Sequence, residues 1–471
     1  MSTLTMKFGG SSVGTTTALT QVVSIVLQEY ERWDRLIVVA SALEGVTDQL
    51  LEAAHLAQLA NRRGYRRITA TLRQRHLALV EHLPLGPTER STLQADIDKL
   101  LFEMLDICQT LADGAPEKKV TPDKVDAIVG VGERLSARII AALLRQNAIR
   151  GVAIDATEII ITDSTYGSAV PNMALTRQRI QQNLLPMLDR RIVPVVTGFI
   201  AGTPDGKPTT LGRGGSDYTA SLLSICAGAK EVWIWTDVDG MMSTDPREVP
   251  EARVVPELSY DEVAELAYFG ARILHARMVR PLQEHQIPLR VKNVFKPQQP
   301  GTLIHSSVPR ITRSIKAVTA IQGLALTAAR NGSLSAISAL VDETLYQTIG
   351  SHADVMISSQ SSSHSFLAFV IPPLAGPDAI HSSQMALEEK LRIFPETGWR
   401  VMPISIISAI GTNLDSVNTL TASIFQALDT IRILALSQGP SHCSLSIVVE
   451  PQNADAALRR LHALTTTQVN R

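Results

Sequence analysis

The sequence predicts an α/β protein in which a mainly parallel sheet with crossover helices is followed by a duplicated strand–helix unit. Two observations support this prediction. Over about the first 306 residues, short apolar runs typical of buried strands alternate with helical patterns, which is typical of a parallel sheet. Beyond residue 312, the hexapeptide 359–364 (SQSSSH) recurs at 437–442 (SQGPSH), and the same order of elements surrounds each copy.

The first part opens with a strand, a glycine turn, a helix and a second strand. Residues 4–8 form the first predicted strand, and the turn Gly9-Gly10-Ser11-Ser12 follows directly. A helical pattern covers 18–29, and the continuous apolar run at 36–40 predicts a buried strand. This order is typical of an α/β sheet with crossover helices.

The middle of the first part is mostly helical. Residues 48–111 show helical patterns throughout, with arginine pairs such as Arg62-Arg63 and Arg66-Arg67 that indicate a solvated helix face. A further helical run at 260–282 precedes a turn at 296–301 and a boundary at 306–312. Strand-like runs are predicted at 127–131, 152–155, 192–199 and 231–235.

Each copy of the duplicated unit is predicted to contain a strand, a helix and two further strands. This β-α-β-β order is the ferredoxin-like arrangement. The first copy has strands at 322–327, 355–358 and 366–371 and a helix at 334–349, and the second has strands at 402–408, 433–436 and 445–449, a helix at 419–428 and another from 454.

Composition excludes several classes of protein. Lys and Arg number 44 against 45 Asp and Glu, and aromatic residues make up 4%, so we expect neither a nucleic-acid partner nor an anionic membrane surface. Cys108, Cys226 and Cys443 lie far apart and form no metal-binding pattern, which indicates core thiols in a reducing compartment. No apolar run approaches the roughly 18 residues of a membrane span. We therefore expect a soluble, cytoplasmic protein.

Two glycine-rich segments at strand ends could hold a phosphorylated ligand. Lys7 ends a predicted strand just before Gly9 and Gly10, whose backbone N–H groups could approach a phosphate closely; the alternative is a tight turn beside a surface lysine. The segment 212–220 (GRGGSDYTA) packs three glycines, an arginine and an aspartate into six residues. Arginine binds carboxylates and phosphates through paired hydrogen bonds, whereas Asp217 could instead cap the following helix.

A third polar segment follows the predicted strand at 231–235. The run 235–240 (WTDVDG) continues to Asp245-Pro246-Arg247 and would lie at the carboxyl edge of the sheet, where open α/β folds bind ligands. Two other segments resemble nucleotide-binding motifs but lack residues that those motifs require. Residues 202–208 are one residue short of a P-loop and end in Pro208, and the segment around Gly132 lacks the third glycine of a dinucleotide fingerprint.

Together, the ordered motifs resemble those of the aspartate kinases. These motifs are KFGGSSV at 7–13, VVASALEGVT at 38–47, VGERLS at 131–136, GRGGSDYTA at 212–220, WTDVDG at 235–240, TDPR at 244–247 and FGARILH at 269–275. The resemblance implies an amino-acid kinase domain over residues 1–306, an α/β/α sandwich around a mainly parallel sheet. Two ferredoxin-like βαββαβ ACT domains follow at 312–395 and 396–471, and their elements can interleave.

The resemblance also implies the chemistry. Mg-ATP would phosphorylate the β-carboxylate of L-aspartate to 4-phospho-L-aspartate, the first step toward lysine, threonine and methionine, with feedback by an amino-acid effector through the ACT domains. The substrate carboxylate is itself the nucleophile, so the protein has only to position the reactants and neutralise charge. A glutamate-type carboxylate kinase of the same fold, and a non-catalytic amino-acid sensor, are the alternatives.

Site residues follow from the matching motifs. Lys7 would contact the transferring phosphoryl group and Asp217 would orient the reacting groups. Arg213 would pair with the α-carboxylate of aspartate and Glu133 would place its ammonium. The other implied aspartate contacts are Ser41, Thr47 and Ser216, and the implied nucleotide contacts are Lys7, Gly9, Gly10, Ser11, Thr236, Asp237, Met242, Arg247 and Arg272. No metal site built from protein side chains alone is expected.

Some positions depart from the family pattern. Ser11 replaces a threonine and keeps its hydroxyl, Met242 stands where many members have a nucleotide-contacting tyrosine, and Arg272 replaces a lysine. In the ACT repeats, Gln360 and Gln438 are the candidates for an effector or dimer contact, with packing between ACT domains as the alternative. A homodimer or higher homo-oligomer through the ACT domains is expected by analogy.

Overall fold

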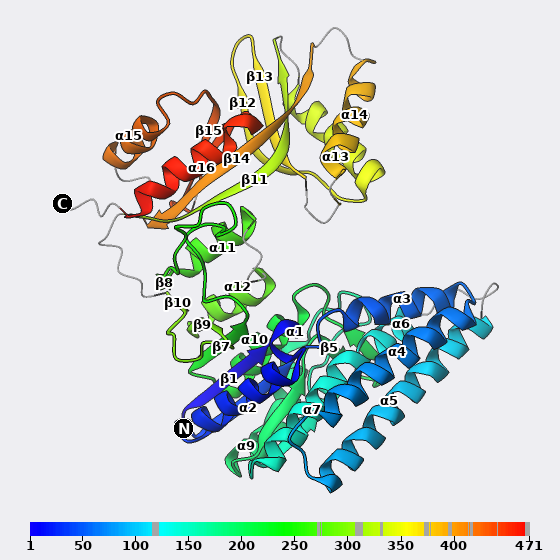
Figure 1. Ribbon diagram of the computed structural model, residues 1–471. Coiled ribbons are helices and arrows are strands. Elements are labelled where there is room, and N and C mark those ends of the chain that lie inside the picture. The colour runs from blue at the N-terminus through cyan, green and yellow to red at the C-terminus, as the bar shows by residue number, and fades with distance from the viewer. Residues whose placement is uncertain are drawn as a thin grey trace. The chain divides into compact units, whose positions relative to one another are not determined.

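The computed structural model describes two compact units (Figure 1). Unit 1 comprises Met1–Met241, Pro256–Tyr260 and Ile273–Val308, and unit 2 comprises Met242–Val255, Asp261–Arg272 and Pro309–Arg471. The residues that the structure describes are 1–114, 122–270, 274, 276–306, 314–329, 333–371, 376, 378–393, 398–412, 414, 418–439 and 441–466.

Unit 1 is organised around an eight-stranded sheet in the order β3-β4-β2-β1-β7-β9-β10-β8. All neighbouring strands run parallel except β9 and β10, so the mainly parallel sheet predicted from the sequence is confirmed. The strands are β1 (Thr3–Phe8), β2 (Arg35–Ala40), β3 (Gly151–Ile154), β4 (Val193–Thr197), β7 (Glu231–Thr236), β8 (Glu257–Leu258), β9 (Leu289–Asn293) and β10 (Thr302–Ile304).

Helices cover both faces of this sheet. On β1, Leu4, Met6 and Phe8 lie in the core shared with α2 (Thr16–Tyr30) and α7 (Val131–Gln146). Lys7 therefore points to the opposite face, because successive side chains of a strand alternate, and there it meets α10 (Gly215–Ala227). The layer of α10 also contains α8 (Met173–Arg179), α9 (Leu185–Asp189), α12 (Ala276–Glu284) and the hairpin of β5 (Ile200–Gly202) and β6 (Pro208–Thr210), whereas Val13 of α1 (Gly10–Val13) lies in the core shared with α2.

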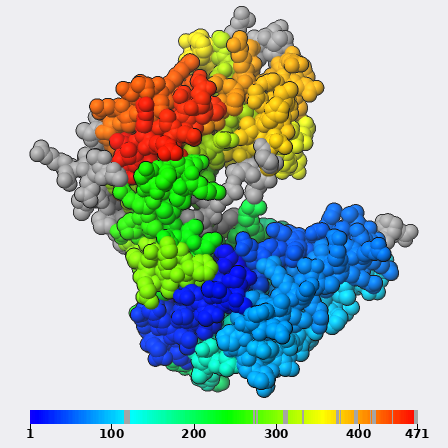
Figure 2. Space-filling view, viewed as in Figure 1, coloured from blue at the N-terminus to red at the C-terminus, as the bar shows by residue number. Residues whose placement is uncertain are grey.

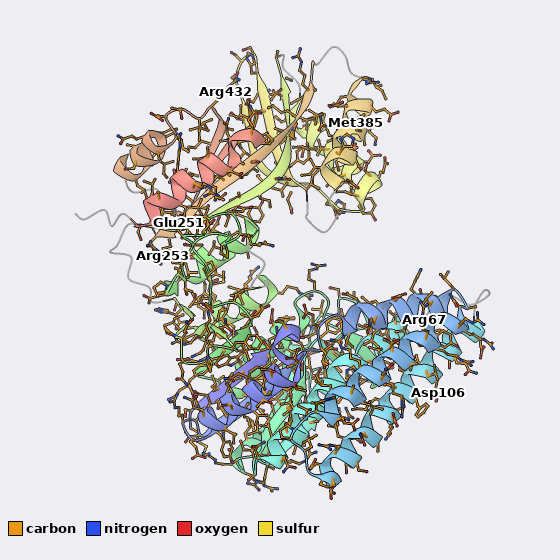
Figure 3. The ribbon with its side chains drawn as sticks, in the orientation of Figure 1. Arg67, Asp106, Glu251, Arg253, Met385 and Arg432 are labelled. Atoms are coloured by element: carbon orange, nitrogen blue, oxygen red, sulfur yellow. The ribbon has the colours of Figure 1, made fainter. Side chains whose placement is uncertain are left out.

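A layer of long helices extends this core. It contains α3 (Val46–Gln58), α4 (Arg62–Glu81) and α5 (Pro87–Gly114), whose inner faces bury Tyr65, Leu72 and Leu101. Their outer faces are polar, as Arg67 on α4 and Asp106 on α5 illustrate in Figure 3, and they form one continuous surface in Figure 2. The predicted solvated arginine face is confirmed, since the arginine pairs at 62–63 and 66–67 are all exposed.

Two predictions for the first 306 residues are wrong. The apolar run 127–131 is not a strand but lies in α6 (Pro122–Val129) and the start of α7, because a run buried on all sides gives no period that separates strand from helix. The helical run 260–282 is interrupted. α11 (Tyr260–Tyr268) ends before Gly270, whose φ of 105° cannot continue a helix, and α12 begins only at Ala276.

Unit 2 contains a six-stranded antiparallel sheet in the order β12-β13-β11-β14-β16-β15. Helices α13 and α14 share a core with one half of the sheet, and α15 and α16 with the other. The strands are β11 (Ser314–Ala328), β12 (Asp354–Gln360), β13 (Ser365–Val370), β14 (Arg400–Thr412), β15 (Ile433–Gln438) and β16 (Ser444–Val449), and the helices are α13 (Leu334–Ile349), α14 (Ala379–Leu391), α15 (Asn418–Ala427) and α16 (Ala454–Ala463).

The two repeats of unit 2 exchange strands through β11 and β14. The second half of β11, from Gly323, pairs with β13 and with the first half of β14. The second half of β14, from Ser405, pairs with β16 and with the first half of β11. Each repeat therefore obtains its fourth strand from the long central strand of the other, and two ferredoxin-like halves form one sheet.

Two segments that precede the repeats in the chain belong to the core of unit 2. Ser243 accepts a backbone hydrogen bond from Val318 (2.8 Å), and its hydroxyl lies 2.8 Å from Nε2 of His462. On α11, the buried carboxylate of Glu262 lies 2.8 Å from Nζ of Lys316 and accepts a hydrogen bond from Thr412 (2.7 Å). Among the described residues, no helix has the length and apolar character needed to cross a membrane.

Candidate active site

Four adjacent strands of unit 1 end at the same edge of the sheet. β4, β2, β1 and β7 are parallel neighbours, and their carboxyl ends lead into Gly198, Ser41, Gly9 and Asp237 respectively. Open α/β folds bind ligands at this edge, because the loops there are free of the sheet and can converge. Two of the three segments that the sequence singled out, those that follow β1 and β7, start from this edge, and the third, 212–220, follows the β5–β6 hairpin.

A cavity of about 350 Å³ opens at this edge of unit 1. It brings together residues from β1, the loop after β2, α3, α7 and the loop that leads into α10. Eight residues predicted from the sequence line it: Lys7, Gly10, Ser41, Thr47, Glu133, Arg213, Ser216 and Asp217.

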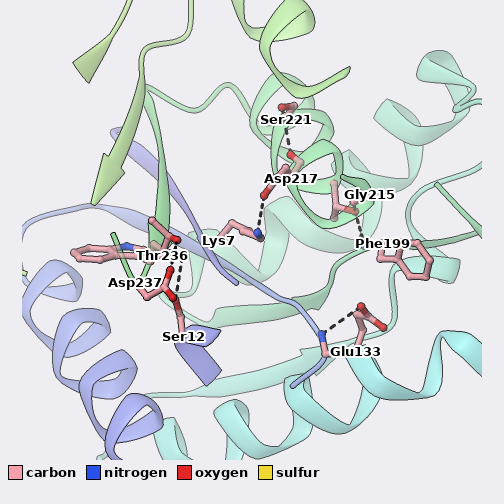
Figure 4. A network of polar contacts seen from close by, with 12 residues as sticks. Lys7, Ser12, Glu133, Phe199, Gly215, Asp217, Ser221, Thr236 and Asp237 are labelled. Atoms are coloured by element: carbon pink, nitrogen blue, oxygen red, sulfur yellow. Dashed lines mark hydrogen bonds and ion pairs between the residues drawn. The ribbon is translucent and has the colours of Figure 1, made fainter. Parts of the chain in front are cut away.

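Lys7 and Asp217 form an ion pair inside the cavity. Nζ of Lys7 lies 2.6 Å from Oδ1 of Asp217, and the two side chains are only 12% and 14% exposed. Figure 4 shows them pointing toward each other from β1 and the first turn of α10. A lysine held in this way presents a fixed positive charge at the edge of the sheet, which is suited to stabilise a developing negative charge.

Glu133 lies at the bottom of the cavity in the first turn of α7. The side chain is 3% exposed, and its Oε1 accepts a hydrogen bond from the backbone N–H of Ala42 (3.2 Å). Burial raises the pKa of Glu133 to about 8, and the Ala42 hydrogen bond opposes this shift. Its Oε2 is buried and has no hydrogen-bond partner among the described residues. A buried carboxyl group with one unpaired oxygen can accept a hydrogen bond from a cationic group, which would favour its ionised form.

Arg213 supplies a positive charge to the cavity. It is exposed in the glycine-rich loop before α10, and its guanidinium has no ion-pair partner among the residues that the structure describes. Ser216 follows at the start of the helix and packs closely on the loop after β4. A Cβ placed on Gly198 would lie 2.7 Å from Oγ of Ser216, so only glycine permits this approach. The cavity thus offers a free cation and a free buried carboxylate.

The predicted nucleotide contacts fall into three groups. Gly9 and Ser11 lie at the end of β1 beside β7, where the N–H of Gly9 donates to the carbonyl of Trp235 (3.2 Å). Thr236 and Asp237 end β7 and are joined by a hydrogen bond of 3.1 Å (Figure 4). Met242 and Arg247 belong to unit 2, and Arg272 lies outside the described residues.

Arg247 is engaged within its own loop. Its guanidinium lies 2.6 Å from Oδ2 of Asp245, while 88% of its side chain is exposed. The effector candidates Gln360 and Gln438 are exposed at the ends of the edge strands β12 and β15.

Sequence reasoning did not select five side chains that line the cavity, which are those of Ala42, Leu43, Glu44, Asp48 and Phe199. Glu44 and Asp48 lie within or just after the motif at 38–47, so that motif could have pointed to them. Phe199 gives no sequence signal, because its role depends on a backbone φ of 65° after β4. Among the described residues, no group of three or more His, Cys, Asp or Glu side chains could hold a metal ion.

Comparison with known proteins places the chain in a family. Residues 2–293 match the model of the amino acid kinase family, and residues 407–464 match an ACT domain. The chain is 32% identical over 472 residues to aspartokinase 3, chloroplastic, of Arabidopsis thaliana, covering 98% of this chain and 81% of that protein. The chain belongs to the aspartokinase family.

Other aspartokinases extend the comparison. The chain is 30% identical to the bifunctional aspartokinase/homoserine dehydrogenase 1, chloroplastic, of Arabidopsis thaliana over 97% of its own length, and it spans about half (50%) of that relative. The crystal structure of E. coli aspartokinase III with aspartate and ADP superposes with a TM-score of 0.74 at 26% identity, covering 98% of this chain and 100% of the other. The complex of the same enzyme with lysine and aspartate gives 0.79. The aspartokinase fold with C-terminal ACT domains is thereby confirmed.

Proposed function

We propose that this aspartokinase transfers the γ-phosphoryl group of Mg-ATP to the β-carboxylate of L-aspartate and releases 4-phospho-L-aspartate and ADP. The observation that supports it is the single cavity lined by Lys7, Glu133, Arg213 and Asp217. E. coli aspartokinase III, which has the same fold, was crystallised with aspartate and ADP.

Arg213 and Glu133 match the two charged ends of an amino acid. In this proposal, Arg213 pairs with the α-carboxylate of aspartate, and the free Oε2 of Glu133 accepts a hydrogen bond from the α-ammonium. Ser41, Thr47 and Ser216 line the same cavity and supply hydroxyl groups for the remaining oxygens. An N-acylated substrate has no ammonium for Glu133, so the cavity favours a free amino acid.

Lys7 then acts on the phosphoryl group in flight. The β-carboxylate of aspartate attacks the γ-phosphorus, and negative charge spreads over the equatorial oxygens as the bond to ADP breaks. The ammonium of Lys7, fixed at 2.6 Å from Asp217, lies where it can neutralise that charge without moving. Asp217 orients Lys7 and needs no proton transfer, because the attacking carboxylate is already ionised.

We assign the nucleotide to the neighbouring strand ends. Gly10 and Ser11 offer backbone N–H groups and a hydroxyl to the phosphates, Gly9 lies next to them with its own N–H donated to the carbonyl of Trp235, and Thr236 and Asp237 lie beside them at the end of β7. Met242, Arg247 and Arg272 complete the proposed nucleotide contacts. The single carboxylate of Asp217, with nucleotide phosphates, is the kind of donor set that Mg²⁺ accepts, and the ion would screen the phosphate charges.

We further propose feedback by an amino acid through the ACT repeats, with Gln360 and Gln438 as effector contacts, and a homodimer or higher oligomer. Both glutamines are exposed at equivalent ends of the two repeats, and E. coli aspartokinase III was crystallised with lysine. We assign residues 1–306, 312–395 and 396–471 to the kinase and the two ACT domains. None of Cys108, Cys226 and Cys443 forms a disulfide, which supports the cytoplasm as the compartment. The proposed role is the first step of lysine, threonine and methionine synthesis.

A coupled assay of ADP release tests the proposed reaction directly. Aspartate with Mg-ATP should give turnover and glutamate should not, and trapping with hydroxylamine should detect the acyl phosphate. Equal turnover with glutamate would assign a different carboxylate substrate, and no turnover with either would favour an amino-acid sensor. Titration with lysine, threonine and methionine, repeated on Gln360→Ala and Gln438→Ala, then identifies the effector.

A further inference from the structure

Two charged side chains outside the cavity hold the loop that carries Arg213. This loop starts from the open end of the β5–β6 hairpin, where Ile200 pairs with Thr210. Just beyond that pair, the N–H of Leu211 donates to the carbonyl of Phe199 (2.8 Å). A cavity-lining segment therefore adjoins each strand of the hairpin at its open end: Phe199 precedes β5, and residues 212–217 follow β6.

Asp126 holds the hairpin through hydrogen bonds to Thr210 at the end of β6. It lies on α6 with 4% of its surface exposed, and its carboxylate accepts three hydrogen bonds. Oδ2 accepts from the N–H of Gly167 (2.9 Å) and the N–H of Thr210 (2.8 Å), and Oδ1 accepts from the hydroxyl of Thr210 (3.0 Å). All donors come from loops or strand ends, so the carboxylate joins segments that are otherwise separate.

Arg277 fixes the next residue from α12. Its Nη1 donates to the carbonyl of Leu211 (2.6 Å), and its guanidinium lies 5.2 Å from the ring centre of Tyr218 in α10. Arg277 thus connects the residue before the glycine-rich loop to the helix after it. Inside the loop, the N–H of Gly215 donates to the carbonyl of Gly212 (2.9 Å). Arg213 lies between these fixed points.

We propose that Asp126 and Arg277 are positioning residues of the aspartate site, which set the place of Arg213 and Ser216 by holding Thr210 and Leu211. This inference rests on the proposed function, since it names the substrate that Arg213 binds. Neither side chain lines the cavity. Both act on the backbone at the base of a loop whose other hydrogen bonds are few, and a displacement of about 1 Å at such a site can lower activity about 100-fold.

Arg277→Met is the first test, because a partly exposed arginine can be replaced without loss of the fold. Arg191 provides a matched control: it also donates to a backbone carbonyl at 2.6 Å, that of Tyr30, and lies over an aromatic ring, but at the end of α2. We expect Arg277→Met to raise KM for aspartate about 10- to 100-fold with KM for ATP nearly unchanged. Arg191→Met should change neither constant.

Asp126 is tested with a pair of variants. Asp126→Ala leaves three donors without an acceptor and should raise KM for aspartate as Arg277→Met does. Asp126→Asn should stay within about threefold of wild type, because the amide oxygen can accept from both backbone N–H groups while the Thr210 hydroxyl accepts from the amide nitrogen. Equal losses toward aspartate and ATP, or an Asn variant as impaired as the Ala variant, would reduce both residues to a structural role.

Hydrogen exchange separates this inference from the proposed function. If the wild-type enzyme turns over no aspartate, the proposed function fails, yet the amides of residues 211–217 still report on the anchors. We expect these amides to exchange at least about tenfold faster in Arg277→Met than in wild type and Arg191→Met, because local opening loses a fixed hydrogen bond. Unchanged exchange in Arg277→Met would overturn the inference.

Discussion

The ammonium of Lys7 lies 2.6 Å from Oδ1 of Asp217, and this pair joins the first strand of the chain to the helix that follows the glycine-rich loop. The two residues come from β1 and α10, so the pair exists only when the sheet and the helix layer have assembled. It places one fixed positive charge where four parallel strands end.

Replacing Lys7 by Met should lower kcat by at least about 100- to 1000-fold, because the variant removes the charge aimed at the transition state. Steady-state ADP release measures this, with circular dichroism to verify the fold. Arg73→Met is the control, since Arg73 forms a comparable 2.7 Å pair with Asp98 on exposed helices and should leave kcat unchanged. A Lys7→Met enzyme with wild-type kcat would remove Lys7 from the mechanism.

Arg213→Ala should act on substrate binding. The loss of a charge-assisted hydrogen bond costs about 1.5–3 kcal/mol, which corresponds to a rise in KM for aspartate of roughly 10- to 150-fold. KM for ATP should stay constant, and so should the melting temperature, because Arg213 is exposed and has no ion-pair partner among the described residues. An unchanged KM for aspartate would show that another group holds the α-carboxylate.

Glu133 should give the enzyme an ascending limb in its pH profile. The residue must be ionised to pair with the substrate ammonium, and burial raises its pKa to about 8 in the free protein. We therefore expect kcat/KM for aspartate to rise with pH and to level off above about 8, since this ratio reports the free enzyme. Glu133→Gln should lose the limb and most of the affinity for aspartate.

The same shift predicts how stability depends on pH. Since the pKa of Glu133 in the folded state lies above the value of about 4.3 in the unfolded chain, its contribution is fully present below that value and is lost as pH rises through about 8. Urea unfolding at pH 5 and pH 9 should thus show wild type losing stability relative to Glu133→Gln. Parallel curves for the two proteins would contradict the buried, protonated state.

Gly198→Ala should impair aspartate binding without contacting aspartate. The new Cβ would lie 2.7 Å from Cβ and Oγ of Ser216 and 3.0 Å from its Cα, so the start of α10 must shift. We expect KM for aspartate to rise about tenfold or more. Gly114→Ala, where nothing lies within 4 Å of the new Cβ, is the control and should behave as wild type.

Glu262→Ala should destabilise unit 2. It leaves the ammonium of Lys316, only 14% exposed, without its carboxylate, and removal of one partner of a buried ion pair typically costs about 3–5 kcal/mol. Urea unfolding followed by circular dichroism measures the loss. Glu284→Ala breaks the exposed pair with Arg280 (3.2 Å) and should cost less than about 1 kcal/mol. Similar losses in the two variants would contradict the buried role of Glu262.

Local pattern was sufficient to predict most elements. The strand at 36–40 and the helix at 334–349 match β2 and α13, because a continuous apolar run and a clean helical period are each distinctive. The run at 127–131 was misassigned for the opposite reason: its residues are buried in the middle of a helical layer, and neighbours from distant segments decide the conformation.

The site residues that stand in recognisable motifs could be predicted from the sequence. The residues that act only through contacts formed on folding could not. Lys7, Glu133 and Arg213 stand in glycine-rich or family motifs, and the structure brings them into one cavity. Asp126 and Arg277 gave no signal, because each acts through backbone atoms of a loop far away in sequence. The attachment of residues 242–255 to unit 2 could not be predicted from the sequence either. It depends on hydrogen bonds between distant segments, such as that from the N–H of Val318 to the carbonyl of Ser243.

The exchange of strands between β11 and β14 limits how this protein can be cut or recombined. A chain that stops after α14 would retain β11 without the partner that covers its first half, and the exposed edge would offer a row of unpaired backbone groups to other molecules. The C-terminal repeat alone would lack β11, which pairs with the second half of β14. Gene fusions and truncations should therefore keep the two repeats together.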